Sequence, residues 1–101
     1  MDKLNLIDQR NKAHNDINRA ERARQVMDDP LLKEAFIAIS GDLFNKFCKS
    51  KFKEAEEREE IYREMKNLHK IEGYLQSVMT DGKLGQETLN MLDRAKKLVG
   101  L

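Results

Sequence analysis

Hydrophobic residues recur three or four positions apart along most of this chain, and no segment alternates between apolar and polar positions as a half-buried strand does. This periodicity predicts an all-α fold, a small antiparallel bundle or hairpin of three to four helices. The segment from Asp29 to Cys48 organises the rest, and it holds three of the four phenylalanines. Its apolar residues are too many for one narrow stripe, so we expect it to be covered from more than one side.

The start of this central helix is well marked. Asp29 can accept hydrogen bonds as an N-cap, and Pro30 at the first helical position loses no donor that the helix needs. Lysines and Ser50 follow the helix, which predicts its end near Cys48. We expect the core to consist of the following apolar residues of this helix and the next: Leu32, Phe36, Ile39, Leu43, Phe47, Met65, Leu68 and Leu75.

The second half of the chain predicts two further helices. The first runs from about residue 54 to 79 and opens with glutamates, which favour a helix N-terminus because of the helix dipole. Asp81 and Gly82 predict a stop, with Gly82 in the left-handed C-terminal position. The last helix then covers about residues 84 to 99.

The N-terminal segment, about residues 4 to 27, predicts a helix with a thin apolar stripe. The first dozen residues have little of their own to pack against, so we expect a protruding N-terminal arm over residues 1–28 and a helical core domain over 29–101. Such an arm needs a partner to become ordered, and a frayed terminus is the alternative interpretation of its thin apolar edge. The predicted partner-binding residues are Leu4, Leu6 and Ile7.

Composition narrows the class of protein. The 101 residues are 40% hydrophobic and 37% charged, with a net charge of +1, so a general attraction to nucleic acid or to an anionic membrane is not expected. The single cysteine excludes an internal disulfide and fits a reducing compartment. The longest apolar run, Ala35 to Ile39, is far too short to cross a bilayer, and no signal peptide is visible. We therefore expect a soluble protein made in the cytoplasm.

No motif carries chemistry. His14 and His69 lie on different segments without further ligands at metal-binding spacing, so we predict no metal site. Cys48 has no histidine partner nearby and follows an aromatic helix face, which predicts a buried, unreactive thiol. The glutamates between residues 54 and 64 have nothing apolar to separate their environments, as paired catalytic carboxylates would need. We predict no catalytic residue and no cofactor, and hence no enzyme.

Nucleic-acid binding remains an alternative. It would use the arginines between residues 19 and 24 and a lysine cluster near the end of the central helix, and it would depend on salt. Neighbouring carboxylates oppose this interpretation. The lysines concerned are Lys46, Lys49, Lys51 and Lys53. A helical adaptor or inhibitor of a host protein fits the composition equally well.

The chain resembles a known family over about residues 23–85. The resemblance rests on two runs, ARQVMDDPLLKEAF and LHKIEGYLQSVMTDGKLG. The family that it resembles is a group of small helical proteins encoded with the head and tail assembly genes of tailed bacteriophages and prophages. The connection between the two runs, CKSKFKEAEER, is less rich in Pro, Thr and Asp than in that group. The residues that match are Ala23, Asp29, Pro30, Leu31, Leu32, Ala35, Phe36, Leu75, Met79, Gly82, Lys83 and Leu84.

The resemblance implies a virion or assembly component and no catalytic residue. Together with the wide apolar faces, it leads us to expect a repeated packing subunit. Such a subunit would contact itself or a larger head, portal, tail or internal virion protein, and no small-molecule substrate or membrane. We expect it in the virion, after synthesis in the host cytoplasm.

Overall fold

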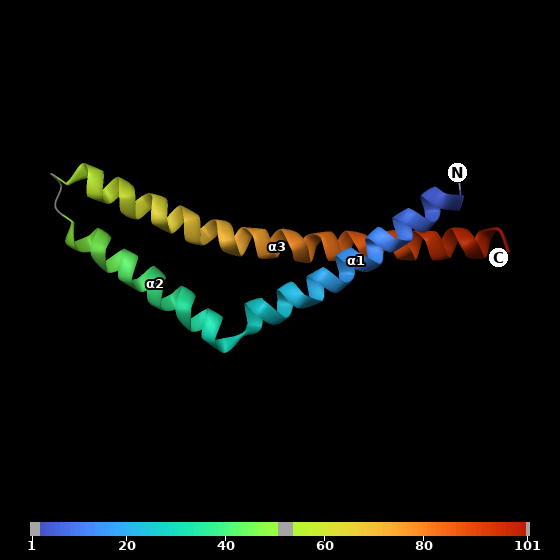
Figure 1. The fold of residues 1–101 in the computed structure, drawn as a ribbon, viewed down its shortest axis with the longest axis horizontal. Coiled ribbons are helices and arrows are strands. Elements are labelled where there is room, and N and C mark those ends of the chain that lie inside the picture. The colour runs from blue at the N-terminus through green and yellow to red at the C-terminus, as the bar shows by residue number, and fades with distance from the viewer. Residues whose placement is uncertain (1–2, 51–53, 101) are drawn as a thin grey trace. The chain divides into compact units, whose positions relative to one another are not determined.

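The computed structural model describes residues 3–50 and 54–100, and helices make up 95% of them. They are α1 (Lys3–Asp28), α2 (Pro30–Lys49) and α3 (Ala55–Leu98), shown in Figure 1. No strand occurs in these two ranges. The predicted all-α class is confirmed, and the predicted limits of the first two helices hold to within about two residues.

The contacts within the chain divide it into two units. The terminal unit comprises Met1–Gln25 and Leu75–Leu101, and the central unit comprises Val26–Tyr74. Helix α3 runs through both of them as one 44-residue helix. The predicted division was an N-terminal arm over residues 1–28 and a core domain over residues 29–101. Whether residues 29–101 fold independently of the arm stays a prediction.

The predicted stop at Asp81–Gly82 is wrong, because α3 continues through it. The two glycines of this stretch are buried, and both lie against α1. A β-carbon on Gly85 would lie 2.8 Å from the carbonyl oxygen of Ala13, and a β-carbon on Gly82 would collide with the β-carbon of Ala20. The glycines therefore permit a close approach of two helices and do not end one.

The terminal unit is an antiparallel pair made of α1 and the C-terminal half of α3. Pairs of contacting residues run in opposite directions along the two helices, from Arg10 and Asp93, joined by an exposed ion pair of 3.5 Å, to Ala20 and Gly82. Small side chains dominate the seam. Its buried residues are Ala13, Ala23, Val78, Gly82, Gly85 and Leu89.

The central unit is built from α2 and the first half of α3. Asp29 caps α2 as predicted: its side chain accepts hydrogen bonds from the backbone N–H groups of Leu31, at 2.9 Å, and Leu32, at 3.1 Å. At the other end, Ser50 donates its backbone N–H to the carbonyl oxygens of Lys46 and Phe47. Between these two caps the apolar residues follow helical spacing, which favours α2 as one helix. The caps satisfy backbone groups that the helix itself leaves without a partner at each end.

Candidate interaction surface

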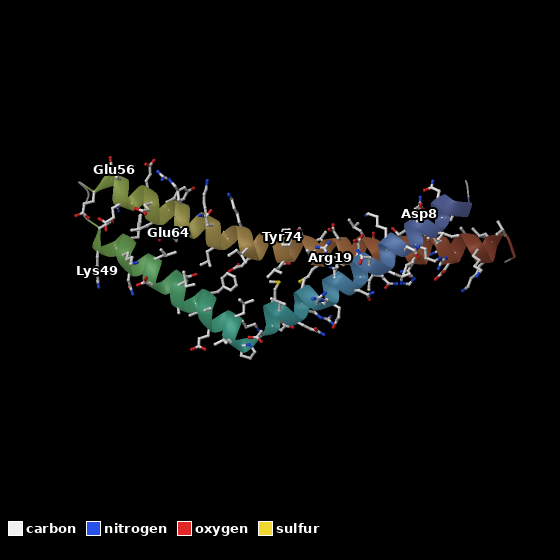
Figure 2. The ribbon with its side chains drawn as sticks, in the orientation of Figure 1. Asp8, Arg19, Lys49, Glu56, Glu64 and Tyr74 are labelled. Atoms are coloured by element: carbon white, nitrogen blue, oxygen red, sulfur yellow. The ribbon has the colours of Figure 1, made fainter. Side chains whose placement is uncertain are left out.

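The central unit buries very little of its apolar surface. Among its described residues only two large side chains are buried, Leu43 of α2 and Ile61 of α3. Near them the guanidinium carbon of Arg58 lies 4.7 Å from the centre of the Phe47 ring, a cation–π contact that ties the start of α3 to the end of α2. Figure 2 labels Lys49 and Glu56 where these two helix ends lie.

Two open grooves are lined by residues of both α2 and the first half of α3. One, of about 540 Å³, is lined mainly by apolar residues of both helices, including Ile39, Leu68 and Ile71, and also by charged residues such as Glu64. The other, of about 520 Å³, contains Tyr62 and Met65. Both linings combine apolar residues with charged ones, and both grooves are open, which suits a helix or another extended surface more than a small polar ligand.

Much of the apolar surface of α2 therefore faces solvent. Two of its residues, Leu31 and Ile37, are each 73% exposed, although α2 is the most hydrophobic of the three helices. Extensive apolar exposure usually marks a contact with another macromolecule, so α2 and the first half of α3 are candidates for such a contact. We call this set the central apolar surface; it consists of Leu31, Ile37, Ile39, Phe44 and Phe47 of α2 and Tyr62, Met65, Ile71 and Tyr74 of α3.

Only part of the predicted core is buried. Leu43 is, and four others are half-buried: Leu32, Phe36, Leu68 and Leu75. The prediction is wrong for the remaining three residues, because in the central unit a single neighbouring helix covers α2 on one side only. They are Ile39, Phe47 and Met65, exposed by 48, 40 and 40%.

Cys48 is exposed, so the prediction of a buried thiol is also wrong. It lies on the side of α2 that carries Ile37, Gly41 and Phe44, at successive spacings of four, three and four. A β-carbon added to Gly41 would meet nothing within 4 Å. This second stripe of α2 was not predicted, because the expected core residues of the helix followed the other stripe alone, that of Leu32, Phe36, Ile39, Leu43 and Phe47. The spacing itself was a usable signal.

The predicted partner-binding residues are placed as follows. Leu6 is half-buried and Ile7 is 52% exposed, both on α1, while the side chain of Leu4 lies outside the described residues. The structure contains no partner, so their role stays a prediction.

Two of the four lysines of the nucleic-acid alternative, Lys51 and Lys53, also lie outside the described residues. Lys46 forms an ion pair of 3.2 Å with Asp42 one turn earlier, and Lys49 is exposed at the end of α2. An ion-paired lysine offers a phosphate less positive charge than an isolated one, because the carboxylate repels the phosphate.

Acidic side chains crowd the start of α3. A hydrogen bond with Glu54, followed by repulsion from the same carboxylate, raises the pKa of Glu57 above its ordinary value of 4.5, and Glu60 adds to the repulsion. These side chains are exposed, and no group of three or more potential metal ligands occurs in the described ranges. The cluster is therefore a charged helix start.

Across the described residues, no helix combines the length and apolar character needed to span a lipid bilayer. Comparison of the chain with protein-family models, with curated proteins and with solved structures gives no significant match in any of the three.

Proposed function

We propose that this protein is a non-enzymatic packing subunit whose central apolar surface is covered by another protein subunit. The observation that carries the proposal is the exposure of the most hydrophobic helix, with Leu31 and Ile37 each 73% exposed and Phe44 59% exposed. Leaving such side chains in water forfeits roughly 25 cal/mol for every Å² that a partner would cover. The open grooves lined by α2 and α3 would accept the partner's own apolar side chains.

The finer part of the proposal is that the subunit belongs to the virion of a tailed bacteriophage. Its support is the resemblance of residues 23–85 to small proteins encoded with head and tail assembly genes. In this setting many copies of one short chain would line or join a larger head, portal, tail or internal protein. Binding through many exposed apolar side chains suits such permanent contacts.

The test is to find the chain in assembled particles. Particles released by the strain that encodes the protein are banded on a density gradient, and the chain is quantified by mass spectrometry against a major head protein. We expect a fixed copy number per particle. Substituting Phe44→Ser should deplete the chain from particles, while Lys49→Ser, at an exposed polar position of the same helix, should not. Absence of the wild-type chain from purified particles would refute the virion assignment.

Nucleic-acid binding through the lysines and arginines is the alternative function, and it can be tested directly. It predicts binding to a DNA duplex that weakens steeply as salt increases. Fluorescence anisotropy at low salt would detect it, and Lys49→Ser would then weaken it. The packing subunit would instead give no signal with DNA and would keep its protein partner at high salt, because apolar contacts are not screened by ions.

A further inference from the structure

The C-terminal half of α3 carries a second apolar row in addition to the one that faces α1. Its members are four and three residues apart in alternation, the heptad spacing of a helix that packs along a partner helix. The large ones are strongly exposed, with Leu84 at 55%, Met91 at 66% and Leu98 at 88%. We call this row the C-terminal stripe; it consists of Leu84, Thr88, Met91, Ala95 and Leu98.

The helix pair of the terminal unit does not use this stripe. The residues of α3 that lie against α1, such as Gly82, Gly85 and Leu89, occupy a different face of the helix. Because that seam is made largely of alanine and glycine, it brings the two backbones close together but removes little apolar surface from water. Two helices with so small a seam gain most from a further layer that covers another apolar face.

We infer that the C-terminal stripe pairs with the same stripe of a second copy of this chain, antiparallel and about a two-fold axis. In this register Leu84 lies opposite Ala95 of the partner subunit, and Thr88 lies opposite Met91 of the partner subunit. Each of these layers combines one large and one small side chain, which lets the two helices interdigitate. Leu98 lies beyond them, at the end of the contact, opposite Asp81 of the partner subunit. The symmetry repeats every layer, as a closed dimer requires.

The charges beside the stripe favour a second copy of this chain in the antiparallel direction. Glu87 and Arg94 lie seven residues apart, so they flank the stripe on the same side. In the antiparallel pair each Glu87 lies beside Arg94 of the partner subunit, which gives two ion pairs per dimer. In a parallel pair the same positions face Leu92 and Val99 of the partner subunit instead. Within the described part of the chain, neither Glu87 nor Arg94 forms an ion pair.

The inference deepens the proposed function, since it names a copy of the chain as one partner of the repeated subunit, but it uses a different surface. Failure of one contact therefore leaves the other testable by itself.

A charge-swap experiment tests the pairing on the full chain. The wild-type mass is measured by light scattering and sedimentation equilibrium from about 1 μM to about 1 mM, where we expect a dimer. Glu87→Arg places two arginines face to face, and Arg94→Glu places two glutamates face to face. Each change alone should raise the dissociation constant about tenfold, because two attractive contacts become repulsive.

The two single variants should pair with each other when mixed in equal amounts, since every contact then joins opposite charges. The double variant Glu87→Arg/Arg94→Glu should dimerise as the wild type does. Met91→Asp should remove the dimer while circular dichroism shows the helices intact. Lys49→Ser, at an exposed position outside both apolar surfaces, should leave the dimer unchanged and serve as the control.

Three results would overturn the inference: a monomeric wild type over the whole range, single charge variants that dimerise as tightly as the wild type, or variants that fail to pair when mixed. A monomer that is still incorporated into particles would remove this interface and leave the proposed function in place. A dimer that is absent from particles would support this interface and refute the virion assignment.

Discussion

The carbonyl oxygen of Ala13 lies 2.8 Å from the position that a β-carbon on residue 85 would occupy, and the α-carbon of Ala13 lies 3.3 Å from it. Position 85 holds glycine, so α1 and α3 meet there backbone to backbone. Neither neighbour is a flexible side-chain end that can move aside. The contact fixes the distance between the two helices of the terminal unit, and every other residue type at position 85 must push them apart.

Gly85→Ala should therefore lower the free energy of unfolding by about 1 to 3 kcal/mol, the usual cost of overpacking. The loss should appear even though alanine is intrinsically the better helix former by about 1 kcal/mol. Urea denaturation followed by circular dichroism measures it.

Gly73→Ala is the matched control, in the same helix. A β-carbon there meets nothing within 4 Å, so the change should raise the free energy of unfolding by about 0.5 to 1 kcal/mol. Equal effects of the two substitutions would show that the close approach does not contribute to stability.

The glycines of α3 also show which features of the fold could be predicted from the sequence and which could not. Asp29 and Pro30 act through neighbours within one turn, so the start of α2 was predictable from local chemistry. Gly82 has the same local signature as a helix end, and only the neighbouring Ala20 shows that it is an internal contact position. That neighbour is 62 positions away in the chain, so α3 alone does not identify it, although Val78, Gly82, Gly85 and Leu89 follow the four-three-four spacing of a continuous helix face.

The candidate surface was predictable in kind but not in detail. An apolar excess on residues 29–48 was evident, and it indicated that something must cover α2. Whether Phe47 and Ile39 are covered within the chain depends on how many helices pack around them. Merging the two predicted C-terminal helices into α3 leaves one fewer helix to do so. The exposure of Cys48 has the same origin.

Asp29→Ala should destabilise the protein by about 1 kcal/mol, because two backbone N–H groups of α2 lose their acceptor. Asp28→Ala is the neighbouring control. Asp28 makes an exposed ion pair with Lys33 at 4.0 Å, at the limit of such a contact, and exposed pairs usually contribute less than about 1 kcal/mol. Thermal unfolding of both variants gives the comparison, and a larger loss for Asp28→Ala would contradict the capping role of Asp29.

Leu43→Ala should cost about 2 to 3 kcal/mol, since Leu43 is 4% exposed and its removal opens the contact between α2 and α3. Ile37→Ala, at 73% exposure, should change the free energy of unfolding by less than about 0.5 kcal/mol. The effects on incorporation into particles should be the opposite. At equal amounts of folded chain, Ile37→Ala should lower the copy number per particle more than Leu43→Ala does, because it removes part of the central apolar surface. Chemical denaturation and the copy number per particle together separate core from interface.

Glu57 gives the chain a predictable response to acid. Its pKa is raised, first by a hydrogen bond with Glu54 that only a protonated carboxyl can donate, and then by repulsion from the Glu54 carboxylate. A raised pKa means that the folded chain binds this proton more tightly than the unfolded chain does. The resulting stabilisation is fully present below the unfolded value, and it is lost as the pH rises through the folded value.

The wild type should therefore gain stability relative to Glu57→Gln as the pH falls from about 7 to about 4, since glutamine takes up no proton in this range. The midpoint of urea denaturation of the two chains, measured at several pH values, gives the difference. Repeating the comparison with Glu54→Gln in both chains should flatten its pH dependence, because the neighbouring carboxylate that raises the pKa is gone. A wild type that instead loses stability relative to Glu57→Gln on acidification would show that the carboxylate of Glu57 stabilises the start of α3 through the helix dipole more than Glu54 and Glu60 oppose it.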